Sequence, residues 1–312
     1  MKLIDFNKHF PTEAKCKERW KEYRVQQGVI CPKCQHEHHY WKKDKECFEC
    51  KKCGWRQSLR ANTVMHGSQL PFRYWFIAIH LLSSTKKGIS ATELQHQLGH
   101  KNYSPIWAML HKLRLAMGNR DTSYKLSGIV ELDEGFFDTE VPKEEKDEPT
   151  KRGRGSQKKT KVLVMAETQT SSEEPKKGQK PTRVKYLKML VIDDLKAETI
   201  DNKVTLCVEQ DSTIKTDNST SYTNLKKLVK KHIAQVIPKE LIGIVLPWVH
   251  IAIGNAKHQI SDIHRGIKPD YLQSYLNEFC YKFNRRYFKD DVFDRILIAC
   301  VNYKNEFRHN IR

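Results

Sequence analysis

The sequence predicts an α/β chain built from several domains. Its 312 residues are enough for two or three domains. Five of the nine cysteines crowd into residues 31–53. Helical patterns fill the stretch up to residue 122, and β-branched or alternating stretches follow it. We therefore expect a lead-in helix with a cysteine-rich segment over residues 1–60, a helical domain over 61–122, and strands with flanking helices over 123–312.

Hydrophobic periodicity places the individual elements. Pro11 and Thr12 open a helix near the N-terminus, and residues 70–118 carry two or three more. In the third part, loops rich in Lys, Glu, Pro, Ser and Gly separate the first three strands. We expect strands over residues 127–137, 161–169, 184–195 and 213–216, and helices over 198–207, 222–232, 255–263, 269–286 and 290–305.

The charge balance favours a polyanionic partner. The chain has 56 Lys and Arg against 37 Asp and Glu, a formal net charge of +19. Each phosphate that a basic protein neutralises releases condensed counterions, so nucleic acid is the natural partner. The alternative is a basic protein with no role on nucleic acid. The start MKLIDFNKHF has no long apolar run, so we expect no signal peptide, and no stretch approaches the roughly 20 apolar residues that span a bilayer. We therefore expect a cytoplasmic, DNA-associated protein without a membrane partner.

The clustered cysteines predict a structural zinc site. Cys31 and Cys34 form one C-x2-C knuckle, Cys50 and Cys53 form another, and fifteen residues separate the two. Two knuckles at this spacing turn four thiolates toward one ion, and Zn²⁺ prefers such a tetrahedron. Cys47 and Cys50 are also two residues apart, but Cys47 falls on the strand before the knuckle, so we prefer the Cys50 and Cys53 pair. The alternative is a group of buried free thiols.

A pair of helices over residues 90–118 resembles a helix-turn-helix. Ser90 and Glu93 form a capping box that starts the first helix, Gly99 ends it, and Pro105 suits the first turn of the second. The second helix of such a unit enters the major groove of DNA. Its expected DNA-facing residues are Trp107, His111, Lys112 and Arg114. The alternative is a helical hairpin that serves only for packing.

Two aspartates on predicted strands are candidate metal ligands. Asp133 lies in the middle of an apolar strand, and Asp217 closes a later one. A carboxylate inside an apolar strand is costly unless it is paired or binds a metal. Glu131 shares the face of Asp133, whereas Glu134 points the other way. Carboxylates from separate strands can converge on two divalent ions, which clamp the attacking and leaving oxygens of a phosphoryl displacement. The alternative is a pair of ordinary surface aspartates.

The order of these parts resembles an insertion-sequence transposase family with an N-terminal zinc ribbon and a ribonuclease-H-like, DDE-type catalytic core. The resemblance covers nearly the whole chain, and the joint order of the motifs is more specific than any one of them. The matching stretches are CPKC…CKKCGWRQS, PFRYWFIAIHLL, VELDEGFF, GRGSQKKTKVLVMAE, TDNSTSY, HIAIGNAK and YLQSYLNEFCYKFNRR.

The resemblance implies a set of catalytic residues. Asp133, Asp217 and Asn255 correspond to the metal ligands, and Lys257 follows Asn255 at the spacing of a branch that carries Asn instead of Glu. Lys257 would contact a phosphate. Three alternatives stay open: Asn255 caps a helix N-terminus, or Asp262 or Glu278 supplies a third carboxylate. His250 also matches the family, and its role stays open between orientation and DNA contact.

Further basic residues are candidate DNA contacts. A Gly-rich basic segment between the first two strands carries Arg152, Arg154, Lys158 and Lys159. Glycines allow a backbone to approach phosphates closely, although a solvated loop is an equal alternative. Near the end of the chain, Arg285 and Arg286 interleave with aromatic residues, and we expect these arginines on DNA.

The function that the resemblance implies is DNA transposition. The protein would bind the terminal inverted repeats of its element as double-stranded DNA, cut them, and join the freed 3′-hydroxyl to target DNA. It would use structural Zn²⁺ and catalytic Mg²⁺ or Mn²⁺, and it would act as a homo-oligomer because two ends are paired. The alternatives are a non-enzymatic zinc-ribbon DNA-binding regulator and a nuclease without joining activity.

Overall fold

The computed structural model divides the chain into two compact units. It describes residues 1–141, 149, 153, 156–170, 180–236, 245–305 and 307. Unit 1 comprises Met1–Arg120 and Arg285–Arg312, and unit 2 comprises Asp121–Asn284. The chain passes from unit 1 to unit 2 between Arg120 and Asp121. The residues from Arg285 onward, which we expected in the third part, instead belong with the N-terminal unit.

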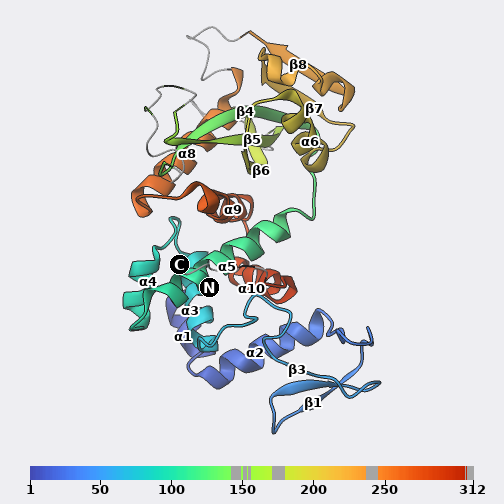
Figure 1. The fold of residues 1–312 in the computed structure, drawn as a ribbon, viewed down its shortest axis with the longest axis vertical. Coiled ribbons are helices and arrows are strands. Elements are labelled where there is room, and N and C mark those ends of the chain that lie inside the picture. The colour runs from blue at the N-terminus through green and yellow to red at the C-terminus, as the bar shows by residue number, and fades with distance from the viewer. Residues whose placement is uncertain are drawn as a thin grey trace. The chain divides into compact units, whose positions relative to one another are not determined.

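Unit 1 consists of helices and a small sheet (Figure 1). Its antiparallel sheet has the order β1-β2-β3. Its strands are β1 (His39–Lys42), β2 (Cys47–Cys50) and β3 (Arg56–Ser58). Its helices are α1 (Leu3–His9), α2 (Glu13–Gln26), α3 (Phe72–Ser84), α4 (Ala91–Leu98), α5 (Tyr103–Asp121, with its last residue in unit 2), the short 3-10 helix η6 (Lys289–Asp291) and α10 (Val292–Asn302). Thr12 caps α2 and Ser90 caps α4, as the sequence predicts.

The C-terminal helix belongs to unit 1 because its apolar face completes the core there. α10 packs on α2 and α3, and Phe293 is fully buried beside Phe10 and Phe76. At the edge of this core, the Tyr23 hydroxyl of α2 donates to Asp294 Oδ1 at 2.6 Å. Sequence periodicity identified α10 as a helix but could not show which domain its apolar face would join.

Unit 2 is built on a mixed five-stranded sheet in the order β6-β5-β4-β7-β8. β4 (Ile129–Asp138), β5 (Lys159–Thr170) and β6 (Thr182–Ile192) are antiparallel neighbours, whereas β7 (Thr213–Asp217) and β8 (Lys231–Gln235) continue parallel to β4. The helices are α6 (Ala197–Cys207), α8 (Pro247–Ile263) and α9 (Pro269–Asn284), with short 3-10 helices η3 (Thr220–Tyr222) and η4 (Leu225–Lys227).

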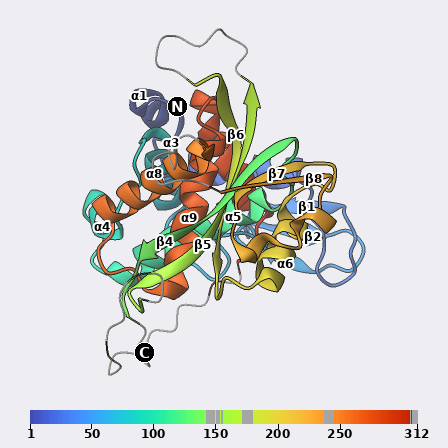
Figure 2. The same ribbon diagram turned by 90° about the horizontal axis from the view of Figure 1, so that it is seen from above.

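Helices cover both faces of this sheet, as Figure 2 shows. Val162, Val164 and Ala166 of β5 pack with α8 and α9 on one face. The alternate residues Leu163 and Met165 pack with α6 and η3 on the other. A strand that is covered on both faces has consecutive apolar residues, which explains the uninterrupted apolar run of β5.

Two helix predictions in unit 2 differ from the structure. The stretch 222–232, expected as a helix, holds the last residue of η3, all of η4 and the start of β8. α8 begins at Pro247 rather than near residue 255. Within the described residues, no helix combines the length and apolarity needed to cross a bilayer.

Candidate catalytic site and cysteine cluster

The two candidate aspartates lie level with each other on adjacent strands. β4 pairs with β7 in parallel only from Ile129↔Thr213 to Glu131↔Lys215. Asp133 and Asp217 each lie two residues beyond the last of these pairs, so they occupy corresponding positions on the two strands. Residues at equal positions of neighbouring strands point to the same face, so the sheet brings together the two carboxylates that the sequence singled out.

Both aspartates line a cavity of about 900 Å³. Glu134 from β4, Lys159 from the start of β5, and His250 and Lys257 from α8 line it as well. The residues of β4 and β7 that line it come after the last pair of the two strands, Glu131↔Lys215. Asp133 and Glu134, which are consecutive on β4, both line it.

Each aspartate has one oxygen fixed by local backbone. The Glu134 amide donates to Asp133 Oδ1 at 2.8 Å, and the Ser219 amide donates to Asp217 Oδ1 at 3.0 Å. Asp133 Oδ2 lies 3.6 Å from Nδ1 of His250. Burial lowers the pKa of His250, while the charge of Asp217 acts in the opposite direction. His250 thus contacts Asp133, which places it at the site rather than on a remote surface.

Glu134 is a third carboxylate at the cavity, and its importance was missed from the sequence. It points away from the Asp133 face, as expected, and accepts a hydrogen bond of 2.6 Å from the buried hydroxyl of Tyr222. Burial and the negative charges of Glu134, Asp133 and Asp217 raise the pKa of that hydroxyl. The TDNSTSY segment therefore supplies both Asp217 and the tyrosine that holds Glu134.

Glu131 anchors α8 to β4. Its Oε2 atom accepts hydrogen bonds from the amides of Trp248 and Val249, at 2.8 and 3.1 Å. Burial raises the pKa of Glu131, and these two hydrogen bonds oppose that effect. Further along α8, the cavity-lining residues are His250, Ile253 and Lys257. They are spaced by three and four residues, so one face of α8 lines the cavity.

Asn255 does not lie on that face. At about 100° per residue it stands about 140° around α8 from His250. It is exposed and is not among the residues that line the cavity. The helix-cap alternative is also wrong, because Asn255 lies in the middle of α8. Neither of the two alternative carboxylates lines the cavity: Asp262 pairs with His258 at 3.4 Å, and Glu278 is buried near Lys282 on α9.

The residues at the cavity suit a hard divalent cation. Carboxylate oxygens are the ligands that Mg²⁺ and Mn²⁺ prefer, and three carboxylates line this space. They are more widely spaced than the cysteines of unit 1. Across the described residues, the cysteines alone bring three or more such ligand atoms within 4.8 Å of one another.

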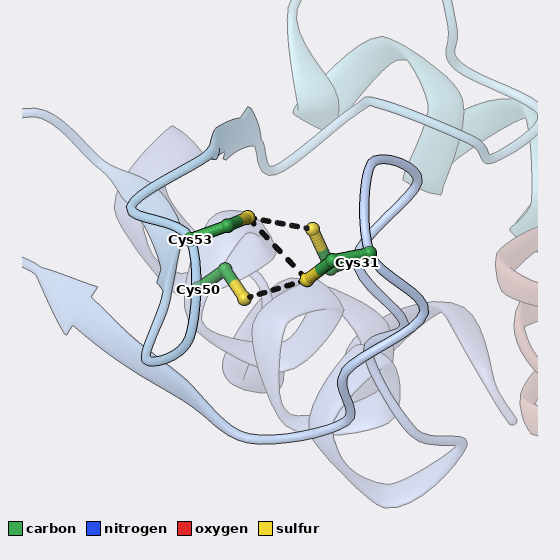
Figure 3. Close-up of side chains that lie close together, drawn as sticks. Cys31, Cys50 and Cys53 are labelled. Atoms are coloured by element: carbon green, nitrogen blue, oxygen red, sulfur yellow. Dashed lines mark hydrogen bonds between the residues drawn. The ribbon is translucent and has the colours of Figure 1, made fainter.

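The four cysteines of the two knuckles converge as the spacing predicted (Figure 3). The Sγ atoms of Cys31 and Cys53 are 3.6 Å apart, and Cys34 Sγ lies 3.6 Å from Cys50 Sγ and 3.4 Å from Cys53 Sγ. Gly54, at a φ of +68°, closes the second knuckle by donating to the Cys50 carbonyl at 3.0 Å. Cys47 lies on β2 outside this group. The donor set is that of a closed, tetrahedral zinc site.

The expected DNA-facing side of α5 is largely buried. His111 and Arg114 are 0% and 1% exposed, and the His111 ring stacks on Phe307 at 5.6 Å. Lys112 Nζ donates to the His66 carbonyl at 3.3 Å, and Trp107 is half-buried. The prediction that His111 and Arg114 face DNA is wrong. It assumed a helix with one apolar face, whereas α5 is enclosed on several sides.

The other basic candidates have different positions. Arg152 and Arg154 lie outside the described residues. Lys158 and Lys159 are exposed, and Lys159 lines the cavity. Arg285, expected on the outside, is 7% exposed and therefore buried. The half-buried Arg286 stacks over the Tyr287 ring at 4.4 Å.

The order of the sheet defines the class of this unit. Three antiparallel strands followed by two parallel ones, with helices on both faces and aspartates on the two central parallel strands, form a ribonuclease-H-like fold. Residues 125–284 match the family model of the ISXO2-like transposase domain, and the chain belongs to that family. The family match confirms the resemblance inferred from the motifs.

Solved structures with a detectable likeness are distant. The Mos1 transposase paired-end complex with left transposon end has 12% identity and a TM-score of 0.27, covering 77% of this chain and 82% of that chain. The Mos1 strand transfer complex has 13% identity and a TM-score of 0.26, covering 78% and 82%. No curated protein matches the chain.

Proposed function

We propose that the protein is a DNA transposase that cuts the terminal inverted repeats of its element and joins them to target DNA, with Asp133 and Asp217 at the catalytic centre. One observation carries this proposal. The two aspartates are level on adjacent strands of an ISXO2-like transposase domain, at the wall of one cavity. In two-metal phosphoryl transfer, paired carboxylates of this kind hold the divalent cations beside the scissile phosphate.

In this proposal, Asp133, Asp217 and Glu134 would hold Mg²⁺ or Mn²⁺. When bound, the ions would supply Lewis-acid stabilisation of the charge that develops during phosphoryl transfer. The ammonium groups of Lys257 and Lys159, which line the same cavity, would neutralise the phosphates of the DNA strand. Asn255 faces elsewhere, so Glu134 takes the place of the third ligand.

We further propose that unit 1 recognises the DNA ends. The four cysteines would hold one structural Zn²⁺ and fix the two knuckles. α4, the turn at Gly99 and α5 would form a helix-turn-helix, presented through the exposed residues of α4 and of the turn rather than through His111 and Arg114. Because two ends must be joined in one reaction, the active form would be a homo-oligomer on DNA.

The proposal is tested with the full-length, zinc-containing protein, Mg²⁺ and duplexes that carry the ends of its element. We expect strand cleavage and strand-transfer products, together with end binding that weakens steeply as salt rises. Asp133→Asn and Asp217→Asn should bind the ends normally and cut nothing. Binding without cleavage by the unmutated protein would instead favour a regulator, and cleavage without joining would favour a nuclease.

A further inference from the structure

Two backbone amides in the first turn of α8 donate hydrogen bonds to a side chain of β4. The residue before the helix, Leu246, makes no side-chain cap, and Pro247 at its start has no N–H to donate. The free amides of Trp248 and Val249 both donate to one oxygen of Glu131. Glu131 is 6% exposed, so these amides replace most of the water that its charge would otherwise bind.

The next residues along β4 and α8 form a second contact between the strand and the helix. Asp133 is two residues beyond Glu131, on the same face of β4. His250 is the residue after Val249, and its Nδ1 lies 3.6 Å from Asp133 Oδ2. Two successive carboxylates of one strand face therefore contact three successive residues of α8.

We propose that Glu131 is a positioning residue: by holding the first turn of α8, it sets the His250 ring against Asp133. This inference rests on the proposed function, because it takes Asp133 to be a catalytic carboxylate. His250 in turn limits the orientations of the Asp133 side chain.

Loss of Glu131 should move the helix start without unfolding unit 2. The Trp248 indole N–H donates to Thr182 Oγ1 at 2.8 Å, which is a separate link from α8 to β6. Val249, Ala252 and Ala256 are buried against the sheet. α8 therefore stays bound to the sheet, while the two amides lose their acceptor and the first turn becomes free to shift.

The test is a double-mutant cycle in the full-length, zinc-containing protein, read as the rate of end cleavage at saturating DNA. Glu131→Ala and His250→Ala should each slow cleavage roughly tenfold to a hundredfold, the effect of a small misplacement of a reacting group. If Glu131 acts through His250, the double variant should be no slower than His250→Ala. Glu131→Gln should recover most of the rate, because its amide oxygen can accept the same two bonds.

Hydrogen exchange of the Trp248 and Val249 amides gives a readout that does not depend on activity. Exchange should be faster in Glu131→Ala than in Glu131→Gln. Glu167 provides a matched control: it is also buried and accepts hydrogen bonds from Ser127 and Lys185. The effect of Glu167→Ala on the rate should be the same with and without His250→Ala.

Two outcomes would overturn the inference. One is a Glu131→Ala effect that is equally large in the His250→Ala background, and the other is unchanged exchange of the two amides. The proposed function is tested separately by Asp133→Asn in the same assay. If Asp133→Asn still cuts, the proposed function is wrong. If Asp133→Asn is inactive while the cycle is additive, only the role of Glu131 is wrong.

Discussion

At the residue scale, three carboxylates within four residues of β4 all have polar partners. Glu131 accepts from two amides of α8, Asp133 from the Glu134 amide, and Glu134 from Tyr222. A buried carboxylate without such partners would be strongly destabilising. The partners come from β4 itself, α8 and η3, so the acidic strand is stable only inside the finished fold.

The buried arginine of α5 gives a residue-scale prediction. Arg114→Ala should lower the free energy of unfolding by about 2–3 kcal/mol, because the large side chain is 1% exposed and its removal leaves a cavity in unit 1. Lys101→Ala, in the exposed turn before α5, should change it by less than about 0.5 kcal/mol. Chemical denaturation of both variants measures the difference. An Arg114→Ala variant with full stability and lost DNA binding would restore the original interpretation.

The sequence alone singled out Asp133 and Asp217, which line one cavity, and the four cysteines, which cluster, but not the partners of the carboxylates. Strand alternation predicts the face of each residue on β4, and knuckle spacing predicts the cysteine cluster. The contacts of Glu131 and Glu134 depend on where α8 and η3 dock, which local pattern does not encode. Asn255 was misplaced for the same reason: the face that α8 turns to the cavity is set by packing of Val249, Ala252 and Ala256.

At the element scale, the two cysteines at the ends of the short strand β2 have different surroundings. Cys47 at its start is buried and pairs with Lys42 and Ser58 across the sheet. Cys50 at its end turns into the sulfur cluster. Three residues along an extended strand reverse the direction of a side chain, so the two cysteines cannot serve the same ion.

This arrangement predicts different outcomes for two conservative substitutions. Cys50→Ser should abolish zinc retention, because a structural zinc site requires all four thiolates. Cys47→Ser should keep one zinc per chain and should lower stability only through the buried hydroxyl. Zinc content is measured by atomic absorption on the purified proteins. Loss of zinc from Cys47→Ser with retention in Cys50→Ser would reassign the second knuckle.

At the scale of the whole molecule, the chain leaves unit 1, forms unit 2 and returns to unit 1. α10 contributes Phe293, Ile296 and Leu297 to the core of unit 1, and each is fully buried. A boundary drawn by sequence at residue 122 therefore describes one crossing of the chain and omits the return at Arg285.

This organisation predicts the behaviour of fragments. Residues 121–284 should unfold in one cooperative thermal transition, because the sheet and its covering helices are complete. Residues 1–120 should not, because removal of α10 exposes the apolar faces of α2 and α3. Circular dichroism with temperature distinguishes the two. A cooperative transition in the 1–120 fragment would show that α10 is dispensable for unit 1.

The central claim is that Asp133 and Asp217 hold the divalent cations that cut DNA. The most direct test replaces each hard carboxylate ligand with a soft thiolate and compares cleavage with different metal ions. Thiolate binds Mg²⁺ poorly and accepts softer ions more readily. Asp217→Cys and Asp133→Cys should therefore bind element ends but fail to cut them with Mg²⁺, and should regain cleavage with Mn²⁺ or Cd²⁺. Full cleavage by either variant with Mg²⁺ would show that these aspartates are not the metal ligands.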